Sequence, residues 1–308
     1  MMNSCIFIAL LAILLGACSN RQLAPSSVKD DALAQRINGF VETIITSDDD
    51  DAKQAPLLAE AKAIFEREGV PSVAKVGDAA SYGFVLVNML GQTLDFQNGF
   101  VKKLREAQAR RELPPDALVF AEAKLRQATI EQRISTRPPT HPALRDEILR
   151  LLKPDQAVRE KDGFDAKKMA KVDRQTALPL RAIFKRHGVP TYDMVGVEAA
   201  KDFIVMVQHQ SPEFRQAVLP KLKFNVDSGQ ADAGNYAMVY DRTQRDQGKK
   251  QLYGSQLECL TGQTLREAPI EEEATVNLRR AELGLFRVEL YARLVKLYSP
   301  NMCGATSR

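Results

Sequence analysis

The chain has 308 residues, of which 44% are hydrophobic and 27% are charged, as in an ordinary globular protein. Its 43 Lys and Arg and 39 Asp and Glu residues are interleaved and give a formal net charge of +4, so no surface dedicated to nucleic acid is expected. The length allows two domains.

Residues 1–17 predict a signal peptide. The apolar run from Ile6 to Leu15 is too short for a transmembrane helix, which needs about 20 residues. The run ends in Leu15-Gly16-Ala17-Cys18, which resembles the bacterial lipobox. That resemblance implies cleavage before Cys18 and attachment of a lipid to it. Because no Lys or Arg precedes the run, a plain secretory signal with a coincidental cysteine is the alternative.

The residue after Cys18 is Ser19, and in Gram-negative bacteria a Ser there resembles the pattern that permits sorting to the outer membrane. We therefore expect a lipid-anchored protein of the cell envelope, on the outer membrane and facing the periplasm. Residues 18–28 are polar, contain a proline and predict a short tether.

The cysteine count predicts one disulfide. Cys5 leaves with the signal peptide and Cys18 is lipidated, so Cys259 and Cys303 remain as an even number in an oxidising compartment. Two free buried thiols are the alternative. A zinc site is not expected, because no CxxC motif or nearby His accompanies them.

The rest of the chain is predicted to be all-α, with two tandem related domains. The segments AIFEREGVPSVAKVG (63–77) and AIFKRHGVPTYDMVG (182–196) share nine of fifteen residues. Their offset of 119 residues indicates a duplicated domain, since solenoid repeats have periods of 20–50 residues. In each copy a helix is predicted to end at Gly69 or Gly188, and a buried helix to begin near Ala79 or Glu198.

The two copies are unequal. The first, residues 29–137, stops near the Pro138-Pro139 pair and is predicted to be degenerate. The second, residues 138–308, is predicted to be intact and to carry the candidate site.

Residues from about 144 to 298 carry a series of polar and glycine-containing motifs in a fixed order. They are Asp155, Gln156 and Arg159; Asp173; Gly188-Val189-Pro190; Val207-Gln208-His209; Asp241-Arg242; Tyr253-Gly254-Ser255-Gln256; Pro269-Ile270-Glu271; and RRAELGL at 279–285. In order and spacing this part of the chain resembles an uncharacterised family of bacterial helical domains of unknown function. The resemblance implies a helical fold and a set of candidate residues, but no activity.

These polar residues are expected at the ends of packed helices. Asp155 and Arg159 are four residues apart and share a helix face, whereas Asp173 is expected to open the next helix. His209 is expected at the end of the buried helix, where the helix dipole favours its cation. Asp241 is expected near the end of a later helix.

Three interpretations of this set remain open. Asp155, Asp173, His209 and Asp241 are candidates for general acid and base groups or for ligands of a hard metal ion. In a second interpretation a group of polar residues grips an anionic or sugar-like ligand: Gln156, Arg159, Arg242, Tyr253 and Gln256. A buried network that fixes helix ends is the third.

The first copy favours a functional site over a structural network. By the repeat, Asp173 becomes Gln54, His209 becomes Leu90, and Asp241-Arg242 becomes Ala123-Lys124. The first copy thus keeps the predicted fold without the polar set, which a set essential for folding would not permit.

The function predicted first is a binding or interaction protein with an envelope protein as partner, of which an inhibitor or immunity protein is one form. A hydrolase using the Asp, His and Arg cluster and a purely structural envelope protein are the alternatives. No cofactor and no metal ion is predicted, because the chain lacks the GxSxG, HExxH, P-loop and GxGxxG motifs. The sequence leaves the oligomeric state open.

Overall fold

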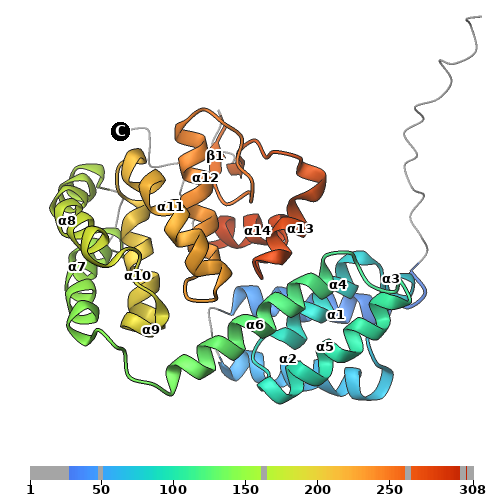
Figure 1. Ribbon diagram of the computed structural model, residues 1–308. Coiled ribbons are helices and arrows are strands. Elements are labelled where there is room, and N and C mark those ends of the chain that lie inside the picture. The colour runs from blue at the N-terminus through green and yellow to red at the C-terminus, as the bar shows by residue number, and fades with distance from the viewer. Residues whose placement is uncertain (1–27, 48–50, 161–164, 261–264, 299–302, 304–308) are drawn as a thin grey trace, which may run out of the picture.

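The computed structural model describes residues 28–47, 51–160, 165–260, 265–298 and 303. The predicted signal peptide, Cys18 and all but the last residue of the tether lie outside the described residues. The prediction of an all-α protein is confirmed (Figure 1). Within the described ranges, no helix is both long and apolar enough to cross a membrane.

The first helical group is built around one buried helix. Its elements are α1 (Asp31–Thr46), α2 (Asp51–Glu68), α3 (Val73–Val76), α4 (Asp78–Met89), α5 (Leu94–Ala109) and α6 (Ala117–Ser135). Every residue of α4 from Ala80 to Met89 is buried. This helix packs against α1, α2 and α6, so it has no solvent-facing side, as its apolar sequence requires.

The second group has the same design. Its elements are α7 (Pro142–Glu160), α8 (Ala166–His187), α9 (Tyr192–Val195), α10 (Val197–Gln208), α11 (Pro212–Asp227) and α12 (Ala233–Asp246). The buried helix is α10, which packs against α7, α8 and α12. The long helix α6 leads from the first group to the second, as Figure 1 shows.

The bounds of the helices repeat between the groups. Both ends of α3 and α4 recur 119 residues later as the ends of α9 and α10 (73 to 192, 76 to 195, 78 to 197 and 89 to 208). The glycines between these helices, Gly77 and Gly196, have φ of 82° and 84°, a conformation that other residues adopt only with strain. We interpret this correspondence between the two groups as the result of an internal duplication.

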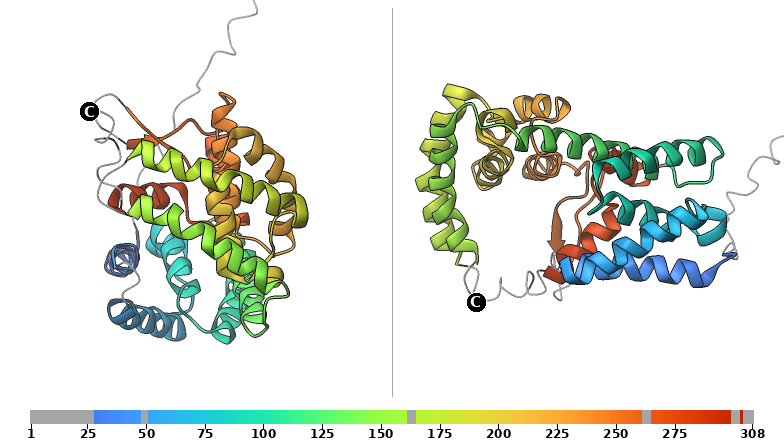
Figure 2. Two further views of the ribbon diagram at one scale, coloured as in Figure 1. Left: turned by 90° about the vertical axis from the view of Figure 1, so that its left-hand side faces the viewer. Right: turned by 90° about the horizontal axis from the view of Figure 1, so that it is seen from below.

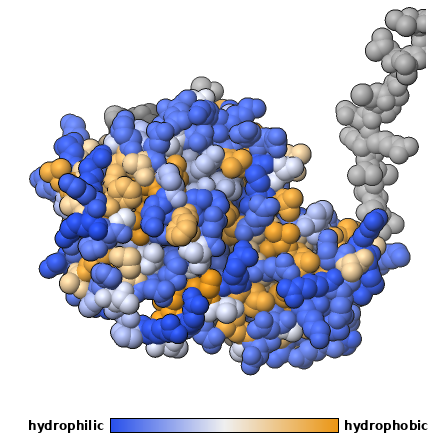
Figure 3. Space-filling view, viewed as in Figure 1, coloured by the Kyte–Doolittle hydropathy of each residue, from blue (hydrophilic) through white to orange (hydrophobic). Residues whose placement is uncertain are grey.

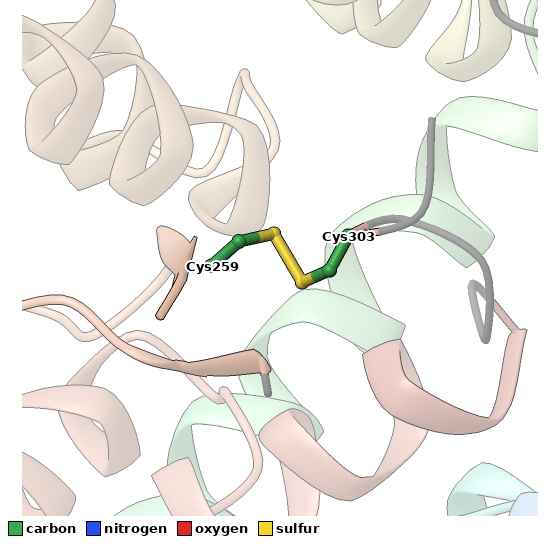
Figure 4. The surroundings of a disulfide bond; sticks show 2 residues. All are labelled: Cys259 and Cys303. Atoms are coloured by element: carbon green, nitrogen blue, oxygen red, sulfur yellow. A yellow bond between two sulfur atoms is a disulfide. The ribbon is translucent and has the colours of Figure 1, made fainter. Parts of the chain in front are cut away.

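After α12 the chain forms a small hairpin that the sequence pattern did not predict. Strands β1 (Leu257–Cys259) and β2 (Leu265–Glu267) pair antiparallel. The predicted disulfide is confirmed, since Cys259 at the end of β1 is bonded to Cys303 with a Cα–Cα distance of 5.5 Å (Figure 4). The bond joins Cys303 to the end of β1.

The last elements pack on the first helical group. They are the 3₁₀ turn η1 (Glu273–Thr275), α13 (Val276–Glu282) and α14 (Val288–Tyr298). Helix α13 contacts α6, and α14 contacts α1, as the right-hand view of Figure 2 also shows. Phe286 and Leu290 join the hydrophobic core of the first group. These contacts cross the domain boundary that the sequence predicts after residue 137. The boundary itself stays a prediction.

The face of the molecule drawn in Figure 3 is mostly hydrophilic, with hydrophobic residues in scattered patches. Among the described residues, the large hydrophobic side chains most exposed to solvent are Leu178 and Phe224, which belong to different helices. Isolated exposures of this kind are normal for a globular protein.

Candidate functional site

The site is built around the C-terminal end of the buried helix α10. The helix ends at Gln208, and His209 is its capping residue. The last carbonyls of a helix lack partners within the helix. Here two arginines act as partners of the last carbonyl. Arg215 of α11 and Arg242 of α12 donate to the Gln208 carbonyl at 3.2 and 3.0 Å. Arg215 also donates to the carbonyl of Gln210.

A cluster of one arginine and two acids lies beside this helix end. Asp155 and Arg159 are one helical turn apart on α7, and Arg159 donates to the Asp155 carboxylate at 2.8 Å. Its other terminal nitrogen donates to Asp173 of α8 at 2.6 Å. The expectation that Asp173 opens its helix was wrong. Helix α8 begins at Ala166 because Asp165 caps it, accepting from two backbone N–H groups.

His209 is oriented by Asp155. Its Nδ1 lies 3.2 Å from an Asp155 carboxylate oxygen, and the other carboxylate oxygen accepts from Gln156 at 3.0 Å. The Asp155 side chain is completely buried, whereas 18% of the His209 side chain is exposed. The carboxylate therefore acts on the imidazole from inside the protein, and the imidazole is the member of the pair that faces solvent.

These groups surround a polar cavity of about 550 Å³, which we call the arginine cavity. Its lining comes from the five helices α7, α8, α10, α11 and α12, from the capping residue of α10 and from the loop after α12. The lining residues are Arg159, Met169, Asp173, Gln208, His209, Arg215, Arg242, Arg245, Asp246 and Gln256. The cavity is in the size range of pockets that bind small molecules.

Three of the four arginines in the cavity are paired with acids. Arg159 is paired with Asp155 and Asp173, Arg215 with Asp246, and Arg245 with Glu258. Among the described residues, no carboxylate forms an ion pair with Arg242. Burial and the neighbouring Arg215 lower the pKa of the Arg242 guanidinium from its usual value.

Two arginine nitrogens of the cavity-lining residues are buried and have no hydrogen-bond partner among the described residues, namely Nε of Arg215 and Nη1 of Arg245. Arg215 as a whole is only 6% exposed. A buried donor without an acceptor costs about 1–3 kcal/mol. Arg242, which lines the cavity without an acid partner among the described residues, makes the cavity a candidate site for an anionic ligand.

A metal ion fits this arrangement poorly. Asp155, Asp173 and His209 offer ligand atoms within 4.8 Å of one another. However, the guanidinium of Arg159 donates to both carboxylates, so a cation would have to displace it and meet its positive charge.

Two predicted site residues lie elsewhere. Asp241 is fully buried and accepts backbone N–H groups of Leu252, Tyr253 and Ser255 at 2.8, 3.1 and 2.9 Å, which holds the loop after α12 in place. Burial raises the pKa of its carboxyl although these bonds lower it. Tyr253 packs against Tyr236 and Tyr240. Neither residue lines the cavity.

The other predicted residues converge. Arg159, Asp173, His209, Arg242 and Gln256 line the cavity, whereas Asp155 and Gln156 support His209 from behind. In addition, the Gln256 side chain accepts from Arg242 at 3.4 Å.

Sequence reasoning missed Arg215, Arg245 and Asp246. For Arg215 a signal existed, since it stands at helical spacing from the buried Val218 and Leu222 and so occupies the apolar stripe of α11. A charged residue on such a stripe is rare unless it has partners. Arg245 and Asp246 gave no comparable signal.

The first helical group has a counterpart of this helix end without the charges. Gln97 of α5 donates to the carbonyl of Met89, the last residue of α4, at 3.0 Å, as Arg215 does to Gln208. Gln54 and Leu90, the equivalents of Asp173 and His209, also line a cavity there. Its other lining residues include Phe286, Leu294 and Tyr298 from the C-terminal segment.

Residues 142–299 match a family of unknown function, DUF6624. The match covers just over half of the chain. The protein belongs to the DUF6624 family. The predicted resemblance of its C-terminal half to an uncharacterised helical family agrees with this match. No curated protein and no solved structure matches the chain.

The DUF6624 region contains every residue that lines the arginine cavity. Helices α1 to α6 lie outside the region, although α13 and α14, which pack on them, lie inside it. The cavity is therefore a feature of the DUF6624 region alone.

Proposed function

We propose that this protein is a lipid-anchored binding protein of the cell envelope and that it holds a singly charged anionic group in the arginine cavity. The observation that carries the proposal is Arg242, which lines the cavity with no acid partner among the described residues. Guanidinium groups bind carboxylate and phosphate oxygens through paired, charge-assisted hydrogen bonds.

Capping of α10 does not explain these charges. The end of a helix carries about half a negative charge, which is much less than two guanidinium groups supply. In the first helical group the neutral Gln97 caps the equivalent carbonyl. A positive charge is thus not needed to end this helix, and the charges of Arg215 and Arg242 are left for another purpose.

The pairing pattern favours one negative charge on the ligand. Arg159 binds two acids, and Arg215 and Arg245 bind one each, which leaves Arg242 as the one arginine of the cavity wall without an acid partner among the described residues. Because four acids already face the four arginines, each negative charge that a ligand adds beyond the one paired with Arg242 is costly, and a monoanion is favoured over a dianion.

The lipid anchor at Cys18 and a place on the periplasmic side of the outer membrane belong to this proposal. The sequence motif at residues 15–18 supports the anchor. An inhibitor or immunity function also falls within the proposal, because an acidic side chain of an envelope protein carries the same single charge. In that case the partner's carboxylate enters the cavity.

Calorimetric titration of the full-length protein tests the proposal with probes of different charge. Diethyl phosphate and acetate carry one negative charge, whereas triethyl phosphate is neutral. We expect the two anions to bind and the neutral ester not to bind. Arg242→Gln should weaken binding of the anions about 10- to 100-fold, which corresponds to the roughly 1.5–3 kcal/mol of a hydrogen bond to a charged group.

Arg105→Gln is the matched control, since this exposed arginine of the first group pairs with Glu122 on the surface. It should leave the affinity unchanged. Equal binding of triethyl and diethyl phosphate, or equal affinities of the Arg242→Gln variant and the unchanged protein, would show that the proposal is wrong.

A further inference from the structure

We propose that the cavity hydrolyses phosphodiesters and that His209 is the general base of the reaction. This inference rests on the proposed binding of a singly charged anion. It adds a chemical step, for which the orientation of His209 by Asp155 supplies the geometry.

The imidazole is held in one tautomer. Asp155 is completely buried, and its carboxylate lies 3.2 Å from Nδ1 of His209. A carboxylate accepts but does not donate, so in the neutral imidazole Nδ1 carries the proton and Nε2 carries the lone pair. For Nε2 no hydrogen-bond partner is found among the described residues, and His209 lines the cavity. A water molecule in the cavity can therefore meet a free base.

Arg242, which is proposed to bind the anion, lies close to His209. Arg242 is bonded to the carbonyl of Gln208, the residue that directly precedes His209 in the chain. Arg159, which is bonded to Asp155, lines the same cavity. A phosphoryl group held by Arg242 thus lies in the cavity that His209 enters, and the guanidinium groups there stabilise charge that develops on its oxygens.

The charge of the cavity selects the class of ester. A phosphodiester carries one negative charge that Arg242 can bind before the reaction begins, whereas a carboxylic ester is neutral until its tetrahedral intermediate forms. The phosphomonoester product gains a second ionisable oxygen, and its dianion brings a further negative charge into a cavity whose four arginines already face four acids. The product is therefore bound less tightly than the substrate.

In the proposed step a water oxygen forms a bond to phosphorus, and the bond from phosphorus to one ester oxygen breaks. The proton of the water passes to Nε2 of His209. The departing alkoxide takes up a proton through solvent, and His209 is returned to its neutral form. One phosphodiester and one water yield one phosphomonoester and one alcohol. Asp155 is a positioning residue in this step, because it acts through the imidazole.

The probe for the reaction is bis(p-nitrophenyl) phosphate, whose hydrolysis releases coloured nitrophenolate. We expect turnover by the full-length protein, and a reduction of kcat by at least 100-fold in His209→Gln, as for loss of a general base. The first helical group has Leu90 at the equivalent position, so a residue other than His at this helix end is compatible with the fold. Calorimetry should show unchanged affinity for diethyl phosphate.

Asp155→Asn tests the positioning role by a second readout. The ¹⁵N chemical shifts of His209 should report a proton on Nδ1 in the unchanged protein, and a mixture of tautomers in the variant. A purely structural Asp155 would leave the tautomer unchanged. Turnover should persist in EDTA and in Arg105→Gln, a surface arginine outside the cavity.

Binding of diethyl phosphate without turnover of bis(p-nitrophenyl) phosphate overturns the hydrolase inference and leaves the binding function intact. Absence of binding overturns both. Turnover that EDTA abolishes, or that survives in His209→Gln, overturns the assignment of His209 as the base.

Discussion

Replacement of Arg287 should destabilise the protein far more than replacement of a neighbouring surface arginine. The Arg287 guanidinium donates two hydrogen bonds of 2.6 Å to Asp116 and lies 4.2 Å from the centre of the Tyr82 ring. Only 16% of its side chain and 7% of that of Asp116 are exposed. Arg287→Gln leaves the Asp116 carboxylate buried without its counter-ion, which costs about 3–5 kcal/mol.

Arg293→Gln is the matched control, because Arg293 also joins the C-terminal segment to the first group. It pairs with Glu42, but more than half of each side chain is exposed, and such pairs contribute about 0–1 kcal/mol. Urea unfolding of the full chain measures both changes. Adding Asp116→Asn to Arg287→Gln should restore part of the stability. Equal losses in Arg287→Gln and Arg293→Gln would refute the argument from burial.

Two further predictions concern Asp241 and Cys18. Asp241→Asn should lower the free energy of unfolding by about 1–3 kcal/mol, because the amide lacks the second acceptor oxygen that serves the Ser255 N–H. The exposed Asp146→Asn should change it by less than about 0.5 kcal/mol, and similar losses in both variants would contradict this. Mass spectrometry of protein from bacterial membranes should show cleavage before Cys18 and an added lipid. Cys18→Ala should remain uncleaved and unlipidated, whereas an unaltered mass in the unchanged protein would exclude the anchor.

The parts of the fold that depend on local sequence were predictable. Gly69 and Gly188 follow directly after the ends of α2 and α8, as expected for glycines at C′ positions. The buried helices begin at Asp78 and Val197, one residue before the predicted starts. In these segments the apolar pattern and the helix-ending residues agree, and both are properties of short stretches of chain.

The contacts that cross the chain were not predictable. The C-terminal residues Phe286 and Leu290 enter the core of the first helical group, and no periodicity in the sequence names the partner of an apolar face. Strands β1 and β2 are three residues long each, which is too short for a recognisable alternation of apolar and polar residues.

The candidate site was predictable where partners lie one helical turn apart. The spacing of Asp155 and Arg159 placed them together, and they form an ion pair of 2.8 Å. Asp241 resembled the other acids in sequence, but its partners are backbone N–H groups 11 to 14 residues away. Whether an acid faces a cavity or a loop depends on such tertiary contacts. Side-chain type and spacing alone do not reveal it.

The packing of α14 sets an order of events in the synthesis of the chain. Phe286 and Leu290 complete the hydrophobic core of the first helical group, and Arg287 neutralises Asp116 there. As long as residues beyond 280 are missing from the folding chain, that core has an open apolar side, and Asp116 lacks its counter-ion. The segment made first therefore reaches its final state only after the segment made last has emerged, and a chain cut short before residue 286 exposes a surface that invites aggregation.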